Sequence, residues 1–124
     1  MSLNSQNSPS HVRVDLGAVA ADTLFKVLKL ERPMTLKQLQ VLDPTGVAAH
    51  ATNTVKVQVK VGSTVYAEWD TTLTTGDGAL PANAWVVSPD KDIRLPAGEL
   101  DVNVDVSASG ALNAGAQCVL ELYG

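Results

Sequence analysis

The chain has 124 residues, of which 13 are acidic and nine basic, giving a formal net charge of −4. This length suits one domain that buries a single core without metals or disulfides. Hydrophobic residues make up 45% and charged residues only 18%, with nine Gly and six Pro, which favours an all-β fold. The chain lacks the basic tract that phosphate neutralisation needs, so nucleic acid is not an expected partner.

Cysteine content and the N-terminal residues bear on the compartment. Cys118 is the single cysteine, so no intrachain disulfide forms and a cysteine-rich secreted scaffold is excluded. The first ten residues are polar, unlike a secretory signal, and no apolar run approaches the ~20 residues of a membrane span. We expect a soluble protein, made in a reducing cytoplasm, without a membrane partner.

The N-terminal segment divides into an arm and a first strand. Residues 1–10 hold Ser, Asn and Gln with too little apolar surface to offset the entropy of ordering, which predicts a flexible arm. His11–Asp15 alternates and predicts an edge strand at the start of a domain covering residues 11–124.

The next two segments are strands with clear ends. Residues 23–30 fit a helical face partly, but Pro33 cuts the segment short and favours a strand. Residues 35–42 form the following apolar segment. Asp43-Pro44-Thr45-Gly46 closes it with turn chemistry, because Pro presets φ and Gly permits a positive φ.

A hairpin over residues 55–69 is the clearest local feature. Every second residue from Val55 to Val61 is Val, and Lys or Gln stands between them, which predicts a half-buried strand. Gly62-Ser63 then forms a two-residue loop with Gly first, the pattern of a type II′ hairpin turn. The second strand is residues 64–69.

The second half of the chain repeats this pattern with longer connections. A polar connection over residues 71–83, where binding residues often sit, precedes the short apolar segment 84–87 and a short strand at 93–95. Residues 100–106 alternate, and a loop of small residues follows at 107–115. The last strand, residues 117–123, is apolar on both faces, which predicts a central place in a sheet or a covered face.

About eight strands with turns every eight to twelve residues predict a single-domain β-sandwich or barrel, and a jelly roll is the first choice.

Three polar positions on one strand raise the question of a metal site. Asp101, Asn103 and Asp105 project from one face, but steps of two residues are about 6.6–6.8 Å apart, too far for one cation. The turn with Asp90 and Asp92 has no EF-hand spacing. We interpret these carboxylates as a solvated surface and expect no metal and no other cofactor.

Catalysis has no signature in the sequence either. His11 and His50 are the two histidines, one beside the arm and one in a loop. Three candidate nucleophiles lack an activating motif or lie in an apolar strand: Ser63, Ser109 and Cys118. Gly110 and Gly115 have phosphate-loop spacing, but Ala116-Gln117 stands where Lys-Ser/Thr is needed. We expect no enzyme, no catalytic residue and no cofactor-binding residue.

Aromatic residues give a weak indication of sugar binding. Tyr66 and Trp69 differ in parity, which predicts opposite faces of their strand and no shared platform. Trp85 follows the long connection and is the better candidate for a ligand contact, although a core position is favoured for it.

The order of these features resembles that of small jelly-roll structural proteins of tailed bacteriophages, with capsid decoration or cement proteins the closest kind. The resemblance covers residues 23–124 and consists of strand and turn patterns. It is carried by Thr45-Gly46-Val47, Thr52-Asn53-Thr54, the Gly62-Ser63 hairpin, Leu95-Pro96-Ala97-Gly98-Glu99-Leu100 and a glycine-containing loop before the last apolar strand.

The resemblance implies a protein that binds major capsid protein subunits on the outside of the shell, often as a homotrimer, and is located in the virion. On this view residues 1–15 and one set of loops contact the shell, while the outer face of residues 117–123 joins copies. A carbohydrate- or receptor-binding module of a phage fibre or tail tip is the alternative, and an enzyme is the third hypothesis.

Overall fold

The computed structural model describes residues 10–124 as an antiparallel all-β structure. Nine strands follow one another in the chain: β1 (Ser10–Asp15), β2 (Thr23–Leu30), β3 (Met34–Leu42), β4 (Thr54–Val61), β5 (Thr64–Asp70), β6 (Val86–Val87), β7 (Ile93–Leu95), β8 (Gly98–Ser107) and β9 (Gln117–Tyr123). The predicted arm, residues 1–10, lies outside the described residues except for Ser10, which begins β1. Within residues 10–124, no helix could cross a membrane.

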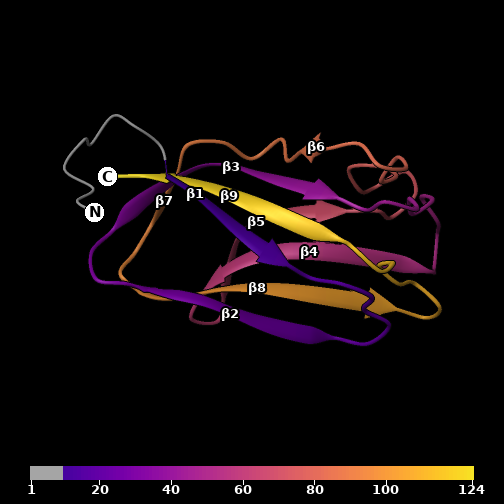
Figure 1. Ribbon diagram of the computed structural model, residues 1–124, viewed down its shortest axis with the longest axis horizontal. Helices are drawn as coiled ribbons and strands as arrows, with labels where there is room; N and C mark the ends of the chain where they lie inside the picture. Colours follow the sequence, from indigo (N-terminus) through magenta and orange to yellow (C-terminus); the bar gives the residue numbers. More distant parts are fainter. Residues whose placement is uncertain (1–9) are drawn as a thin grey trace.

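The strands form two sheets, and in each sheet a strand from the start of the chain lies beside one from its end (Figure 1). One sheet has the order β1-β9-β3-β6, with β7 also paired to β3, and the other has the order β2-β8-β4-β5. Consecutive strands at both ends of the chain therefore fall in opposite sheets, as in a jelly roll. The predicted jelly-roll β-sandwich is confirmed. The described strands number nine instead of about eight because the strand beside β3 is split into β6 and β7.

The core lies between the sheets and is built by period-two alternation. β4 and β8 pair so that Val57 faces Val104 and Val59 faces Val102, and all four side chains are buried. On the other sheet Cys118, Leu120 and Leu122 of β9 are buried. β9 lies between β1 and β3, which confirms the central place predicted for it. Burial of each such valine or leucine contributes roughly 1.5–3 kcal/mol.

The β4–β5 hairpin has the predicted loop and one unpredicted irregularity. Val61 pairs with Thr64 across Gly62-Ser63, and Gly62 has a φ of 63°, as the first position of a type II′ turn requires. The register then shifts beside Val59, which breaks simple alternation in β5. Tyr66 and Trp69 both pack against the core, so the prediction that they lie on opposite faces is wrong.

Trp85 is not the core anchor that the sequence favoured. Its side chain is 44% exposed. The residue immediately precedes β6, whose two residues are too few to fix a longer alternating segment against the sheet. Trp85 therefore remains available for contact with another molecule.

The long connections gather at one end of the sandwich, at the right of Figure 1. They are the segments 16–22, 43–53, 71–85 and 108–116, which we call the loop end. Ser10 and Leu122 pair near the opposite end, where the tight hairpin also lies. The polar connection predicted to carry binding residues thus lies at the loop end.

Val59→Asp tests the assignment of the core face. The substitution places a charge at a fully buried position and is expected to lower the free energy of unfolding by at least about 3 kcal/mol, measured by urea denaturation. Val65→Asp is the matched control, because Val65 is exposed and lies opposite Lys60. Equal stability of the two variants would show that the buried face is assigned wrongly.

Candidate functional site

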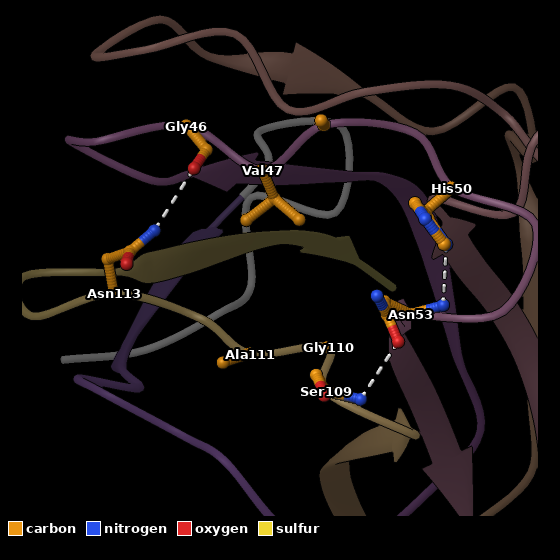
Figure 2. Close-up of a pocket in the computed structure, with 9 residues that line it drawn as sticks. Gly46, Val47, His50, Asn53, Ser109, Gly110, Ala111 and Asn113 are labelled. Atoms are coloured by element: carbon orange, nitrogen blue, oxygen red, sulfur yellow. Dashed lines mark hydrogen bonds between the residues drawn. The ribbon is translucent and has the colours of Figure 1, made fainter.

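A shallow pocket of about 310 Å³ lies at the loop end (Figure 2). Two of the gathered loops form it, segment 43–53 on one side and segment 108–116 on the other. The lining residues are Gly46, Val47, Ala48, His50, Asn53, Ser109, Gly110, Ala111 and Asn113. Most of these residues have small side chains, so the positions of the two loop main chains largely determine the shape of the pocket.

Asp43 holds together the two loops that form the pocket. Its carboxylate is fully buried, and Oδ1 accepts hydrogen bonds from the main-chain N–H groups of Thr45 and Gly46, both at 3.0 Å. From the other loop, the main-chain N–H of Asn113 donates to Oδ2 at 2.9 Å and its amide Nδ2 donates to Oδ1 at 3.0 Å. Four donors compensate the cost of burying the charge.

Two further hydrogen bonds brace the pocket on either side, and both are visible in Figure 2. Asn113 Nδ2 donates to the Gly46 carbonyl at 3.0 Å, and the main-chain N–H of Ser109 donates to Asn53 Oδ1 at 3.1 Å. Gly110 fits against Thr54 so closely that a Cβ atom there would lie 2.2 Å from the Thr54 carbonyl oxygen. The backbone shape of the pocket therefore depends on glycine at position 110.

His50 is fixed by its own loop. Nδ1 accepts hydrogen bonds from the main-chain N–H groups of Thr52 at 3.0 Å and Asn53 at 2.9 Å. A ring with Nδ1 occupied as an acceptor carries its proton on Nε2. Such a ring offers an N–H donor and no free nitrogen base, so this geometry favours recognition of an acceptor group over proton abstraction.

A third loop, segment 71–85, is hydrogen-bonded to segment 43–53 of the pocket. Val47 and Leu80 exchange two main-chain hydrogen bonds of 2.8 Å, and the main-chain N–H of Leu73 donates to the His50 carbonyl at 2.9 Å. Trp69 Nε1 donates to the Gly78 carbonyl at 3.0 Å, which ties the same loop to β5. Leu73 is nevertheless 51% exposed, so a braced loop displays an apolar side chain.

The two histidines considered from the sequence lie in different places. His50 and Ser109 line the same pocket, a proximity that their separation in sequence did not indicate. His11 lies on β1, where its Nε2 is 3.6 Å from Oε1 of Glu121. That Glu121 oxygen also accepts hydrogen bonds from the side-chain amides of Gln38 at 2.7 Å and Gln40 at 3.0 Å. These contacts form a polar cluster on the outer face of the first sheet.

The carboxylates considered as metal ligands are dispersed. Asp90 Oδ2 is 3.3 Å from the Ser88 hydroxyl, and Asp92 Oδ1 accepts a hydrogen bond from the Tyr123 hydroxyl at 2.8 Å. That bond raises the pKa of Tyr123. Among residues 10–124, no group of three or more His, Cys, Asp or Glu side chains is placed to hold a metal ion.

The polar face of β8 is less uniform than predicted. Asn103 joins Gln58 on β4 through a hydrogen bond of 2.9 Å, while partial burial, followed by a hydrogen bond with Asp22 and its charge, raises the pKa of Asp105. Asp101 is only 5% exposed, so the prediction of a solvated side chain is wrong for this residue. The reason is its central strand: Lys26 and Lys60 flank it in register.

Cys118 is a buried thiol. Burial raises its pKa to about 12, so the thiolate is scarcely populated near neutral pH. This agrees with the interpretation of Cys118 as a packing residue.

Comparison with known protein families and with curated proteins finds no match to this chain.

Asp43→Asn tests the loop brace. The amide places N–H donors where the carboxylate accepts from other N–H groups, and we expect the free energy of unfolding to fall by about 2–4 kcal/mol in urea denaturation. Hydrogen exchange is expected to quicken in segments 43–53 and 108–116. Asp15→Asn, at an exposed position on β1, is the control and should stay within about 0.5 kcal/mol of the parent protein. Unchanged exchange in Asp43→Asn would contradict the role of this carboxylate.

Cys118 is expected to resist thiol reagents in the folded protein. At pH 8, well below its raised pKa, an aromatic disulfide reagent should label less than about a tenth of the thiol, whereas labelling in denaturant should be complete. Rapid labelling of the folded protein would contradict the burial of β9.

Proposed function

We propose that this chain is a structural protein that binds the outside of a bacteriophage capsid and stabilises it by bridging major capsid protein subunits. In this role it is not an enzyme, and its partners are the capsid protein and further copies of itself. The proposal starts from the resemblance of residues 23–124 to phage decoration proteins, to which the jelly-roll topology adds support. A fold hosts many functions, so the surfaces carry the rest of the argument.

The braced loop end is the observation that carries the proposal. Its loops are joined by Asp43 with Asn113, by Asn53 with Ser109 and by the main-chain pair of Val47 with Leu80. A surface held in this way loses little conformational entropy on binding, because few groups remain to be ordered. Leu73 and Trp85 project from it as apolar contacts of the kind that anchor protein interfaces.

Repetition over a shell makes moderate contacts sufficient. Many copies on one lattice are held by multivalency even when each single contact is weak. We assign the shell contact to the loop end and a second contact to the N-terminal residues 1–15, whose strand β1 begins near the opposite end of the sandwich. Contact between copies, in a trimer, is assigned to the outer face of β9, where Val119 and Tyr123 are half-buried.

One observation favours a second function. Trp85 is exposed at the edge of the β-sandwich, and an exposed indole ring is a suitable platform for the apolar face of a sugar. The pocket adds hydrogen-bonding groups from His50 and Ser109. A carbohydrate- or receptor-binding module of a phage fibre is therefore the alternative, and saturable binding in a glycan array would favour it.

Imaging of particles tests the capsid role. Particles assembled from the structural proteins encoded beside this chain, with and without it, would be compared by electron cryomicroscopy. The expected result is a regular external density at threefold positions that disappears with the chain, together with lower resistance of the shell to heating. Identical particles in the two preparations, or a density confined to the tail, would contradict the proposal.

Variants identify the surface that makes the contact. Leu73→Ala and Trp85→Ala are each expected to weaken binding to preformed shells by about 1–2 kcal/mol, measured by co-sedimentation. Val65→Ala is the control, since Val65 is exposed on β5 away from the pocket. Equal binding by all three variants would remove the loop end from the shell contact.

A further inference from the structure

The two sides of the sandwich are closed differently. On one side the segment after β6 covers the border of β3, because the main-chain N–H of Ser88 donates to the Leu39 carbonyl at 2.8 Å. The same serine side chain contacts the Glu68 carbonyl of β5 at 3.3 Å, so this segment joins both sheets. On the other side β1 and β2 form the two borders, and within residues 10–124 no ladder joins them (Figure 1).

β2 has one paired border and one without a strand. It pairs with β8 and stands first in its sheet, so in the described part of the chain no strand lies beyond it. An edge of this kind presents main-chain N–H and C=O groups to an added strand. We call this border of residues 23–30 the β2 edge.

Apolar side chains accompany the β2 edge. Leu24 is 47% and Leu28 37% exposed, while Phe25 and Val27 are half-buried and pack against the core. Leu28 pairs with the buried Leu100, whereas Leu24 pairs with Asn103 on the face of the lysines. The apolar face of an added strand could therefore cover Leu28 and its half-buried neighbours. The gain would be burial of apolar surface in addition to main-chain hydrogen bonds.

The charged side chains of residues 23–30 are Lys26 and Lys29, and the acidic residues Asp22 and Glu31 flank this segment. Lys26, Lys29 and Arg32 are three of the nine Lys and Arg residues, and all three are exposed. Lys26 pairs in register with Asp101, and Lys29 with Glu99. The ion pairs of the described residues involve His11 and Arg13, not these lysines.

The charge decides which strand fits. Antiparallel pairing of β2 with β2 of a second copy would bring the lysines of one copy near those of the other, and like charges across a strand pair are destabilising. Lysines on an edge strand are a known protection against such self-pairing. A strand with Asp or Glu on the matching face reverses the sign of this interaction.

We propose that the β2 edge binds an extended segment of another protein, with acidic and apolar side chains in alternation, as an added strand. The apolar side chains of the segment cover Leu28 and its half-buried neighbours, and its carboxylates meet Lys26 and Lys29. The inference does not depend on the capsid role, because it concerns a different surface from the loop end.

A pair of peptides tests the inference. A blocked, fluorescent peptide of alternating Val and Glu, about as long as β2, is titrated into the full chain, and the same peptide with Lys for Glu serves as comparison. We expect saturable binding of the acidic peptide, weakened by salt, with new hydrogen-exchange protection in residues 23–30. No binding, equal binding of the two peptides, or protection confined to other strands would overturn the proposal.

Charge reversal separates the β2 edge from general electrostatics. The double variant Lys26→Glu with Lys29→Glu is expected to bind the acidic peptide roughly tenfold more weakly and to gain binding of the lysine peptide. Lys37→Glu with Lys91→Glu is the matched control, with the same change of net charge at exposed positions elsewhere. Circular dichroism and thermal melting establish that both variants are folded.

Two results of the variant experiment would reject the proposal. Equal weakening in both double variants would mean that net charge, not the edge, attracts the peptide. Protection of residues 23–30 that appears without peptide and rises with protein concentration would identify a second copy as the occupant.

Discussion

The structure depends on keeping one face of each strand dry. In the second sheet this constraint is satisfied by β4 and β8, whose valines face one another in register as Val57 with Val104 and Val59 with Val102. A slip of one residue would turn these side chains to water and bring Lys56 and its polar neighbours into the core. The register therefore follows from burial, and the positions of the loops follow from the register. Because the positions of β4 and β8 are fixed, segment 43–53 ends and segment 108–116 begins at fixed points, and these two segments line the pocket.

At the loop end, a buried carboxylate holds two loops together, as apolar contact holds the two sheets together. Asp43 and Asn113 lie far apart in the sequence, yet two hydrogen bonds join them directly. Buried charge is costly when unpaired, so this brace stabilises one arrangement of the loops and penalises others. The brace at Asp43 therefore gives the loop end one defined shape. It explains why a pocket lined largely by glycine, alanine and main chain keeps a defined form, and why Leu73 can be displayed on a loop that is itself well anchored.

Much of the architecture could be predicted from the sequence, because strand alternation and turn chemistry are local. The hairpin at Gly62-Ser63 and the central place of β9 follow from residues that are neighbours in the chain. The site could not be predicted in the same way. Asp43 and Asn113 are 70 residues apart in the sequence, and neither local sequence indicates that the two residues are in contact. The sequence favoured a core position for Trp85 and a solvated one for Asp101, and both predictions are wrong for a related reason. The exposure of Trp85 depends on how short β6 is, and the burial of Asp101 depends on which strands lie beside β8.

A two-layer sandwich, unlike a closed barrel, has edge strands whose outer main-chain groups are not paired within the sheet. Here the chain closes one side with its own residues 88–92, whose main-chain groups donate to carbonyls of β3 at Leu39 and Lys37. On the β1 and β2 side, protection comes from charge instead, through Arg13 on one strand and Lys26 with Lys29 on the other. Charge is a selective protection: it disfavours self-pairing while leaving the main-chain groups open to a strand of opposite sign. Under the proposal for the β2 edge, Lys26 and Lys29 disfavour pairing of β2 with β2 of a second copy and favour a strand that carries acidic side chains.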